Sequence, residues 1–346
     1  MSKGVVLMNL GSPDSTEVRD VRRYLNEFLM DEKVIDIAYL ARLLLVRGII
    51  VPFRAPKSAK AYQSIWTKEG SPLIVLSKQL QAALQDSVDE PVTLAMRYGN
   101  PSPKAAFDEL VAKLPELDEV IVIPLYPHYA MSSYETGVEY AVKVHKEQKY
   151  SFKLNIIDAF YNDADYLNAL CESIKPYLAQ DYDHIVFSYH GIPERHVQKT
   201  DPTKQHCLKI ENCCSVDSSA HAFCYRHQII FTTHEAAARL NLPKDKYSFS
   251  FQSRLGRDEW LKPYTVNRLR EMPQEGIKKL LVVCPAFVSD CLETLEEMAE
   301  EGKEIFLASG GESFTLIPCM NVHPLWVQTL AKWVKQRIKK DGKAFV

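Results

Sequence analysis

The sequence has almost no net charge, because 42 lysines and arginines stand against 44 aspartates and glutamates in 346 residues. It also has no basic tail, no acidic block and no low-complexity segment. A partner such as nucleic acid requires an excess or a cluster of cations, so this balance argues against one. The first residues lack the apolar core and the small-residue cleavage site of a secretion signal. We therefore expect a cytoplasmic protein with reduced thiols.

A long uninterrupted hydrophobic run is absent as well. The most apolar stretch, residues 34–53, is broken by Asp36, Arg42 and Arg47, which argues against a membrane-spanning helix. An apolar helical face next to cations can lie on a membrane surface, so residues 34–60 are a candidate for peripheral contact with the inner membrane. Burial of the same side chains in a core explains the run equally well. The cations that follow the run are Arg54, Lys57 and Lys60.

Short β-type runs alternate with longer amphipathic stretches, which is typical of parallel sheets covered by helices. The two halves of the chain repeat this pattern weakly, with similar turns after corresponding runs. We predict an α/β fold of two similar doubly wound, Rossmann-like domains, residues 1–150 and 151–323, that face each other across a cleft. A helix over residues 324–346 is expected to pack back on the first domain. The predicted strands are Val5–Leu10, Val92–Tyr98, Val120–Tyr126, Phe152–Ile157, Ile185–His190, Tyr247–Gln252 and Leu280–Cys284.

The segment SYHGI, residues 188–192, carries the first candidate for chemistry. His190 follows the apolar run 184–187, so it lies where a buried strand ends. Ligands bind at this carboxyl edge in open α/β sheets. A neutral imidazole there can act as a base or as a metal ligand. A histidine in a strand is also often structural, so the position alone leaves both interpretations open.

The apolar run 279–284 ends in the same way and leads into a helix with several carboxylates. Asp290 is expected to cap this helix over residues 291–302, and Glu293 and Glu297 are four residues apart and share a face. Glu293 lies one turn from the strand end and can point into the cleft. It can equally complete a capping box with Asp290, and spacing alone favours the capping role slightly.

Aromatic and cationic residues follow other predicted strands. Arg97 and Tyr126 lie at two strand ends of the first half, and Phe251 ends a strand of the second. An aromatic cleft with a few cations suits a flat, hydrophobic ligand that carries carboxylates. Each of these side chains taken alone could equally be core or surface.

Cysteine is unevenly distributed, since four of the eight cysteines fall within 18 residues. They lie in a turn-rich insertion at residues 201–228. Disulfides are disfavoured in a reducing compartment, whereas four thiolates can hold an iron–sulfur cluster or a zinc ion. The spacing matches neither common ferredoxin motifs nor paired zinc knuckles, so we predict a metal centre without choosing between them; a plain surface loop is the alternative. The four cysteines are Cys207, Cys213, Cys214 and Cys224.

Three motifs together resemble the ferrochelatase family: SYHGIPERH, FQSRLGRDEW and CPAFVSDCLETLEE. The resemblance extends from LMNLGSP through RYGNPSP and PLYPHYAMSS to the C-terminal helix, nearly the whole chain. Enzymes of this family insert ferrous iron into a porphyrin to make haem. The resemblance therefore implies a ferrochelatase that converts protoporphyrin IX and ferrous iron into protohaem.

The resemblance also implies roles for single residues. His190 and Glu293 correspond to catalytic family residues that face each other across the porphyrin cleft and contact the substrate iron, and Glu297 corresponds to a further carboxylate. The resemblance puts the 34–53 segment at the lip of the pocket. Cys291 departs from members that carry histidine at this position, which puts its role as a metal ligand in doubt. The residues expected to bind the porphyrin are Arg97, Tyr126, Phe251 and Phe287.

The resemblance gives the cysteine-rich insertion a specific interpretation too. Some bacterial ferrochelatases carry an internal 2Fe-2S cluster in this region, and this chain resembles that subgroup. Cys207, Cys213, Cys214 and Cys224 are then the expected ligands. Coproporphyrin as the substrate, a related cobalt chelatase and a tetrapyrrole or metal carrier remain alternatives for the function, and zinc remains one for the centre.

Overall fold

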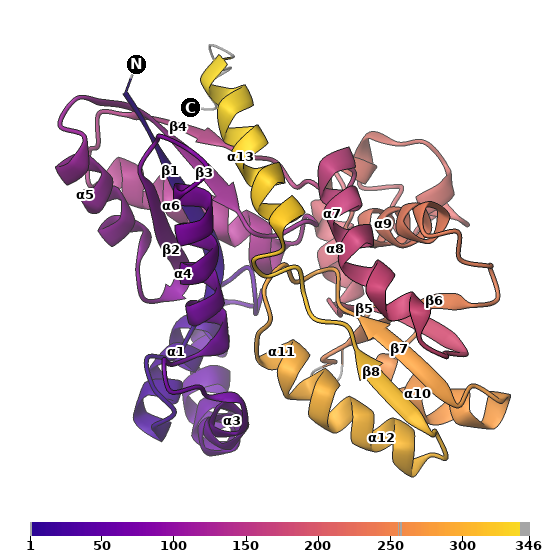
Figure 1. Cartoon of the computed structure of the whole chain (residues 1–346). Helices are drawn as coiled ribbons and strands as arrows, with labels where there is room; N and C mark the ends of the chain where they lie inside the picture. Colours follow the sequence, from indigo (N-terminus) through magenta and orange to yellow (C-terminus); the bar gives the residue numbers. More distant parts are fainter. Residues whose placement is uncertain (1, 255, 257, 340–346) are drawn as a thin grey trace. The chain divides into compact units, whose positions relative to one another are not determined.

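The computed structural model describes residues 2–254, 256 and 258–339, so the predicted helix end at 340–346 lies outside the described residues. The chain divides into two compact units (Figure 1). The first comprises residues 1–125, 131–159 and 327–346, and the second comprises 126–130 and 160–326. Helix α13 (Pro324–Lys339) thus begins in the second unit and continues in the first.

The first unit contains a four-stranded parallel sheet in the order β2-β1-β3-β4. Val6 in the central strand β1 lies opposite Thr93 on one side and Val122 on the other. A strand covered by helices on both faces is apolar along its length, which explains the run VVLM in β1. The strands are β1 (Ser2–Ser12), β2 (Val92–Gly99), β3 (Leu117–Pro124) and β4 (Lys153–Ile156). The helices are α1 (Val18–Leu29), α2 (Tyr39–Leu43), the π-helical η1 (Leu44–Ile50), α3 (Val51–Ile65), α4 (Pro72–Gln85), α5 (Pro103–Lys113), the π-helical η2 (Met131–Glu135) and α6 (Thr136–Glu147).

The second unit repeats this arrangement with the order β6-β5-β7-β8, again entirely parallel. The predicted pair of similar doubly wound sheets is therefore confirmed, although the sequence interpretation missed β8. The strands are β5 (His184–His190), β6 (Tyr247–Gln252), β7 (Lys279–Val283) and β8 (Ser313–Leu316). The helices are α7 (Ala164–Ile174), η3 (Lys175–Ala179), α8 (Glu194–Thr200), η4 (Cys213–Ser215), η5 (Ser219–Phe223), α9 (Tyr225–Arg239), α10 (Thr265–Glu271), η6 (Met272–Glu275), α11 (Leu292–Leu295), the π-helical η7 (Glu297–Gly302) and α12 (Lys303–Ala308).

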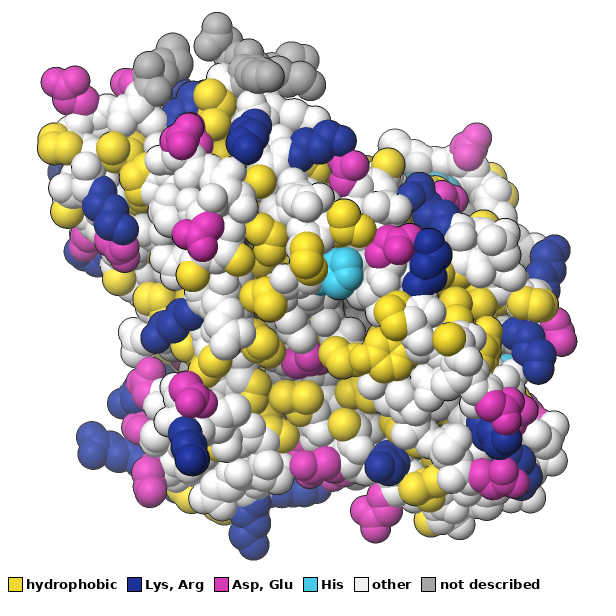
Figure 2. All heavy atoms as spheres, in the orientation of Figure 1, with side chains coloured by type: hydrophobic (Ala, Val, Ile, Leu, Met, Phe, Trp, Pro, Cys, Tyr) yellow, Lys and Arg dark blue, Asp and Glu magenta, His cyan; other side chains and the backbone are white. Residues whose placement is uncertain are grey.

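Each sheet has its own apolar core. Met8 and Val122 pack with Phe107 in the first unit, and Val282 packs with Phe306 in the second. Burying a side chain of this size contributes about 1.5–3 kcal/mol, so these contacts hold the strand ends in place. On the face seen in Figure 2, Lys and Arg side chains are interspersed with Asp and Glu rather than gathered in one broad patch.

Within the apolar segment 34–53, residues 39–53 form a continuous helical stretch made of α2, η1 and the start of α3, whereas residues 34–38 form turns and bends. One side of it is buried through Val46 and Val51. The other side is exposed, and Leu44 and Phe53 keep 72% and 78% of their surface accessible. Burial in a core therefore accounts for one side of the segment, and contact of the exposed side with a membrane stays a prediction. Within the described residues, no helix combines the length and the apolarity needed to cross a bilayer.

Candidate active site

The carboxyl ends of β5 and β7 bring the main candidates together within the second unit. β5 lies between β6 and β7. The chain therefore goes from β5 to its neighbour on one side and then returns to its neighbour on the other side, so the order of the strands reverses at β5. Ligands bind at such a switch point in doubly wound sheets. His190 is the last residue of β5, and the chain that follows β7 runs through Phe287 to Glu293.

His190 is half-buried and its ring is fixed on two sides. Its Nδ1 lies 2.6 Å from the carbonyl oxygen of Gly191, and its ring meets Phe287 edge to face at 6.4 Å. A nitrogen this close to a carbonyl must carry the proton, so in the neutral imidazole Nε2 is the basic atom. Gly191 itself has no room for a side chain, because a Cβ would lie 2.8 Å from the Gln252 carbonyl oxygen.

The two predicted carboxylates follow β7 on a short helix that changes type. Glu293 lies in α11, and Glu297 is the first residue of the π-helical turn η7. Burial raises the pKa of Glu297 and the nearby Glu293 carboxylate adds to this, while the Ser253 hydroxyl and the electrostatic interaction with His190 oppose it. His190, Glu293 and Glu297 therefore interact electrostatically, and burial favours the protonated form of the Glu297 carboxyl.

The predicted cap of this helix is wrong. Cys291, not Asp290, is the N-cap, and the capping box pairs Cys291 with Thr294. Asp290 instead accepts hydrogen bonds from Asn321 Nδ2 at 2.6 Å and from Thr294 Oγ1 at 3.0 Å. Glu293 takes no part in the capping box, so its carboxylate is left for other chemistry. Burial raises the pKa of the Cys291 thiol well above its usual value, and Glu293 adds to the effect.

Gln252, the last residue of β6, and Ser253, the residue after it, form hydrogen bonds with the two glutamates. The sequence interpretation gave Gln252 and Ser253 no role. The Gln252 side-chain amide donates to the Glu293 carbonyl at 3.0 Å. Ser253 has a left-handed backbone (φ 66°) and donates from Oγ to a Glu297 carboxylate oxygen at 2.5 Å. The motif FQSRLGRDEW contains both residues, but the contacts join positions more than 40 residues apart and leave no local pattern.

The expected porphyrin-binding residues lie in both units. Phe251 is buried next to Gln252 in β6, and Phe287 is half-buried beside His190. Tyr126 is buried at the start of the short segment 126–130 that belongs to the second unit. Arg97 lies near the end of β2 in the first unit.

Arg97 is engaged in a network that the sequence did not predict. Its guanidinium pairs with Asp31 and donates from Nε to Thr136 Oγ1 at 2.7 Å. It also stacks between Tyr98 and Tyr140, 4.3 Å from each ring centre. Burial opposes ionisation of Asp31, but hydrogen bonds from Thr136 and the Lys33 amide, together with Arg97, hold its pKa below the usual value.

The four clustered cysteines converge in the loop between α8 and α9. The Cys224 thiol makes hydrogen bonds with both Cys207 and Cys214, and Cys214 also bonds with Cys213. The contact with Cys207 and burial raise the pKa of Cys224 to about 12, and the contact with Cys214 opposes this rise. Cys207, Cys213 and Cys224 are buried, whereas Cys214 is half-buried.

Two N–H donors, one of them cationic, lie next to the sulfur atoms of this group. The Leu208 amide donates to Cys213 Sγ at 3.4 Å, and the Arg226 guanidinium lies 3.3 Å from Cys214 Sγ. Such N–H to sulfur contacts and a neighbouring cation are what thiolate ligands of a cluster need. In the part of the chain that the structure describes, however, no group of three or more His, Cys, Asp or Glu side chains is arranged to hold a metal ion.

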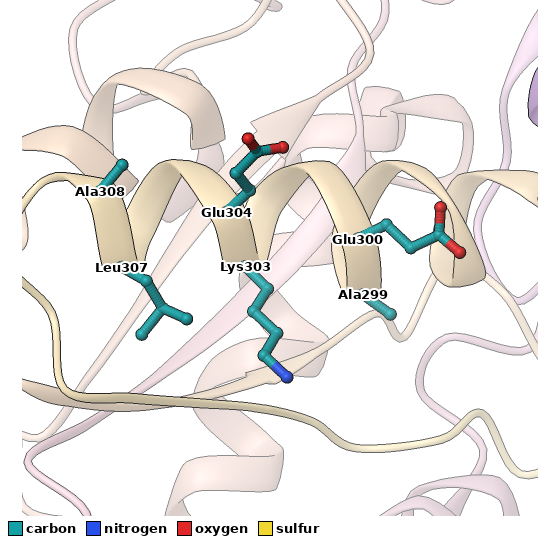
Figure 3. Close-up of a pocket in the computed structure, with 6 residues that line it drawn as sticks. All are labelled: Ala299, Glu300, Lys303, Glu304, Leu307 and Ala308. Atoms are coloured by element: carbon teal, nitrogen blue, oxygen red, sulfur yellow. The ribbon is translucent and has the colours of Figure 1, made fainter.

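A shallow hollow elsewhere in the second unit contains none of these residues. The hollow lies along η7 and α12, and Figure 3 shows that the side chains lining it project from this single helical stretch. The lining residues are Ala299, Glu300, Lys303, Glu304, Leu307 and Ala308. The strand ends, not this hollow, therefore carry the candidate chemistry.

Comparison with known proteins identifies one family. The model of the ferrochelatase family matches residues 2–338. The ferrochelatase of Opitutus terrae is 51% identical over 340 residues and covers 96% of this chain and 97% of its own length. That of Stutzerimonas stutzeri is 49% identical over 332 residues, with 95% and 96% covered.

Solved structures show the fold. SirB from Bacillus subtilis with Fe³⁺ covers 97% of this chain and 95% of its own, at 13% identity and a TM-score of 0.53. The sirohydrochlorin chelatase SirB from Bacillus subtilis subspecies spizizenii in complex with cobalt has the same coverage, 9% identity and a TM-score of 0.54. At such identities the likeness concerns the α/β architecture alone.

Proposed function

The chain belongs to the ferrochelatase family, whose members insert iron into porphyrin, and we propose that it converts protoporphyrin IX and ferrous iron into protohaem, the last step of haem biosynthesis. The observation that carries the proposal is the meeting of one imidazole and two carboxyl groups at the ends of β5 and β7. Insertion must remove the pyrrole N–H protons and strip water from iron. A base and carboxylate oxygens supply the acceptors and ligands for both tasks.

In this proposal His190 and Glu293 are catalytic and contact the iron, and Glu297 assists Glu293. The Nε2 atom of His190 is oriented as an acceptor by the Nδ1 contact with Gly191. Glu297 holds a proton more readily than an ordinary glutamate, so it can pass protons between Glu293 and solvent. Porphyrin contacts are assigned to Tyr126, Phe251, Phe287 and, beside its pairing with Asp31, Arg97.

The test is anaerobic incubation of the purified protein with ferrous iron and protoporphyrin, followed by loss of porphyrin fluorescence. We expect rapid loss with the wild type and none with His190→Ala, which should still bind porphyrin. Turnover by His190→Ala would overturn the role of this residue. Faster turnover of coproporphyrin in a parallel assay would overturn the choice of substrate, and porphyrin binding without insertion would indicate a carrier.

We also propose that Cys207, Cys213, Cys214 and Cys224 hold a 2Fe-2S cluster. Such a cluster supplies one-electron redox chemistry or structural cross-linking. The support is a set of four thiols in pairwise contact, N–H donors directed at sulfur, and the Arg226 guanidinium, which offsets thiolate charge.

The proposed location is the cytoplasm, with peripheral contact to the inner membrane through residues 34–60. The support is the combination of exposed apolar side chains and cations on α2, η1 and α3. Leu40, Leu44 and Phe53 are at least 71% exposed, and Arg47 and Arg54 are exposed among them. Apolar insertion and attraction to anionic headgroups act together on such a surface.

A further inference from the structure

The backbone carbonyl of His190 is held by a tyrosine that the proposed chemistry does not use. Tyr225 is buried, with 5% of its surface exposed, and its hydroxyl donates to the His190 carbonyl oxygen at 2.8 Å. The adjacent Gly191 amide donates to the Gln252 carbonyl at 2.8 Å on the other side of the strand. The His190–Gly191 peptide is therefore fixed at its oxygen by Tyr225 and at its nitrogen by Gln252.

The sheet itself cannot supply the first of these contacts. Neighbouring residues of a strand direct their hydrogen-bonding groups to opposite sides. Because Gly191 bonds toward β6, the carbonyl of His190 points toward the side of β7. That ladder ends at the pair formed by Phe187 and Val283, before His190 is reached. Tyr225 thus replaces a missing strand partner where the imidazole leaves the sheet.

The position of Tyr225 depends on the cysteine-rich loop. Tyr225 is the first residue of α9, and Cys224 is the N-cap, its sulfur accepting from the His227 amide at 3.5 Å. The Cys224 thiol also bonds with Cys207 and Cys214. A change in the bonding of these thiols would alter the N-cap formed by Cys224 and hence the start of α9. Cys224 directly precedes Tyr225, whose side chain holds the His190 carbonyl.

We propose that Tyr225 is a positioning residue for His190 and that it couples the cysteine-rich loop to iron insertion. The proposal rests on the catalytic role proposed for His190. It assigns the loop a function in the reaction through a hydrogen bond, whatever the loop binds. The phenol acts on the rate because the aim of Nε2 depends on the peptide that Tyr225 and Gln252 hold.

The first experiment removes only the hydroxyl. Tyr225→Phe is expected to lower kcat for iron insertion about tenfold, as the loss of one buried hydrogen bond predicts, while KM for porphyrin changes less than about twofold. Tyr134→Phe is the matched control, because its hydroxyl donates to the Ile157 carbonyl at 3.1 Å in the first unit. Both variants should lose similar thermal stability, and Tyr134→Phe should keep kcat. Equal kcat values for the two variants would overturn the positioning role.

The second experiment tests the coupling without changing Tyr225. Cys224→Ala should lower kcat several-fold, and adding it to Tyr225→Phe should lower kcat no further, because both act through the same hydrogen bond. Porphyrin binding, measured by fluorescence quenching, should stay within about twofold in all three proteins. Additive losses, or an unchanged kcat in Cys224→Ala, would overturn the coupling. His190→Ala is run alongside, and if it retained turnover the fault would lie in the role proposed for His190.

Discussion

Gln252 joins the two halves of the candidate active site through both its backbone and its side chain. Its carbonyl accepts from Gly191, next to His190, and its side-chain amide donates to the Glu293 carbonyl at 3.0 Å. The opposite end of the amide accepts from Ser188 at 2.8 Å. The end of β6 thus sets the backbone positions from which the imidazole and the carboxylate act, although it carries neither group.

Replacing Gln252 with leucine should therefore impair catalysis more than folding. We expect kcat for iron insertion to fall about tenfold to hundredfold, because a positioned catalytic group loses a buried hydrogen bond. Gln81→Leu is the control, since the Gln81 amide donates to the Val92 carbonyl at 2.9 Å in the first unit. Equal losses of kcat per folded molecule in both variants would contradict the positioning role.

The raised pKa of Glu297 makes a prediction about stability and pH. Burial raises this pKa in the folded protein, so the folded state binds the proton more tightly than the unfolded state does. The resulting stabilisation is fully present below the unfolded pKa of about 4.3 and is lost as pH rises through the folded pKa. Glu297→Gln, which stays neutral, should gain in melting temperature relative to wild type as pH rises above the unfolded pKa of about 4.3.

The exposed Glu300 supplies the control for this experiment. Glu300→Gln should show a melting-temperature difference from wild type that hardly varies with pH. If the melting-temperature difference between Glu297→Gln and wild type also did not vary with pH, the raised pKa of Glu297 would be contradicted. In the activity assay, Glu297→Gln should slow iron insertion less than Glu293→Gln, and the reverse order would contradict the ranking of the two carboxylates.

The Arg97–Asp31 pair should contribute to stability as well as to the pocket. The two side chains are only 13% and 6% exposed, and breaking such a pair from one side costs about 3–5 kcal/mol. We expect Arg97→Leu to lower the free energy of unfolding by about this amount, and Arg97→Leu with Asp31→Leu to recover most of it. Porphyrin affinity distinguishes a role of Arg97 in stability from a role in binding. If the double variant, which lacks Arg97, regained the affinity of the wild type, direct binding by Arg97 would be contradicted.

Acid should weaken the same pair. Because Asp31 has a lowered pKa in the folded protein, its contribution is present above the unfolded value of about 3.9 and disappears as pH falls through the folded value. Urea unfolding of wild type should lose stability in this acidic range, and Asp31→Asn should lose less there. A parallel decline of the two proteins would contradict the assignment.

The sequence predicts the strand ends well and the contacts between them poorly. The apolar runs before His190 and Cys284 are long enough to identify β5 and β7, and they locate both chemical groups at one sheet edge. β8 was missed because Ser313–Leu316 is four residues long and only partly apolar. Asp290 is a favourable N-cap by residue type, yet its carboxylate accepts hydrogen bonds from Asn321 and the Cys319 amide instead. These partners are distant in the sequence, so no local pattern predicts them.

Membrane contact through residues 34–60 is tested by removing exposed apolar surface. Leu40→Ser, Leu44→Ser and Phe53→Ser combined should weaken sedimentation with anionic vesicles at least hundredfold, since each side chain contributes about 1.5–3 kcal/mol on burial. The control pair Val111→Ser and Val266→Ser removes side chains that are 38% and 40% exposed on other helices. Turnover in detergent should be unchanged. Equal vesicle binding by both sets would contradict membrane contact through this segment.

The cysteine-rich loop makes the last prediction. Protein purified without oxygen should absorb visible light, and Cys213→Ala should bleach it and release iron, because the proposed cluster loses one of four thiolates. Cys171→Ala, a buried cysteine outside the loop, should keep the colour. Arg226→Leu should retain the cluster but lose it faster to a chelator, because the guanidinium that lies 3.3 Å from Cys214 Sγ no longer offsets thiolate charge. Colourless wild-type protein that contains zinc would contradict the iron–sulfur assignment, and metal-free protein with four titratable loop thiols would contradict a metal centre altogether.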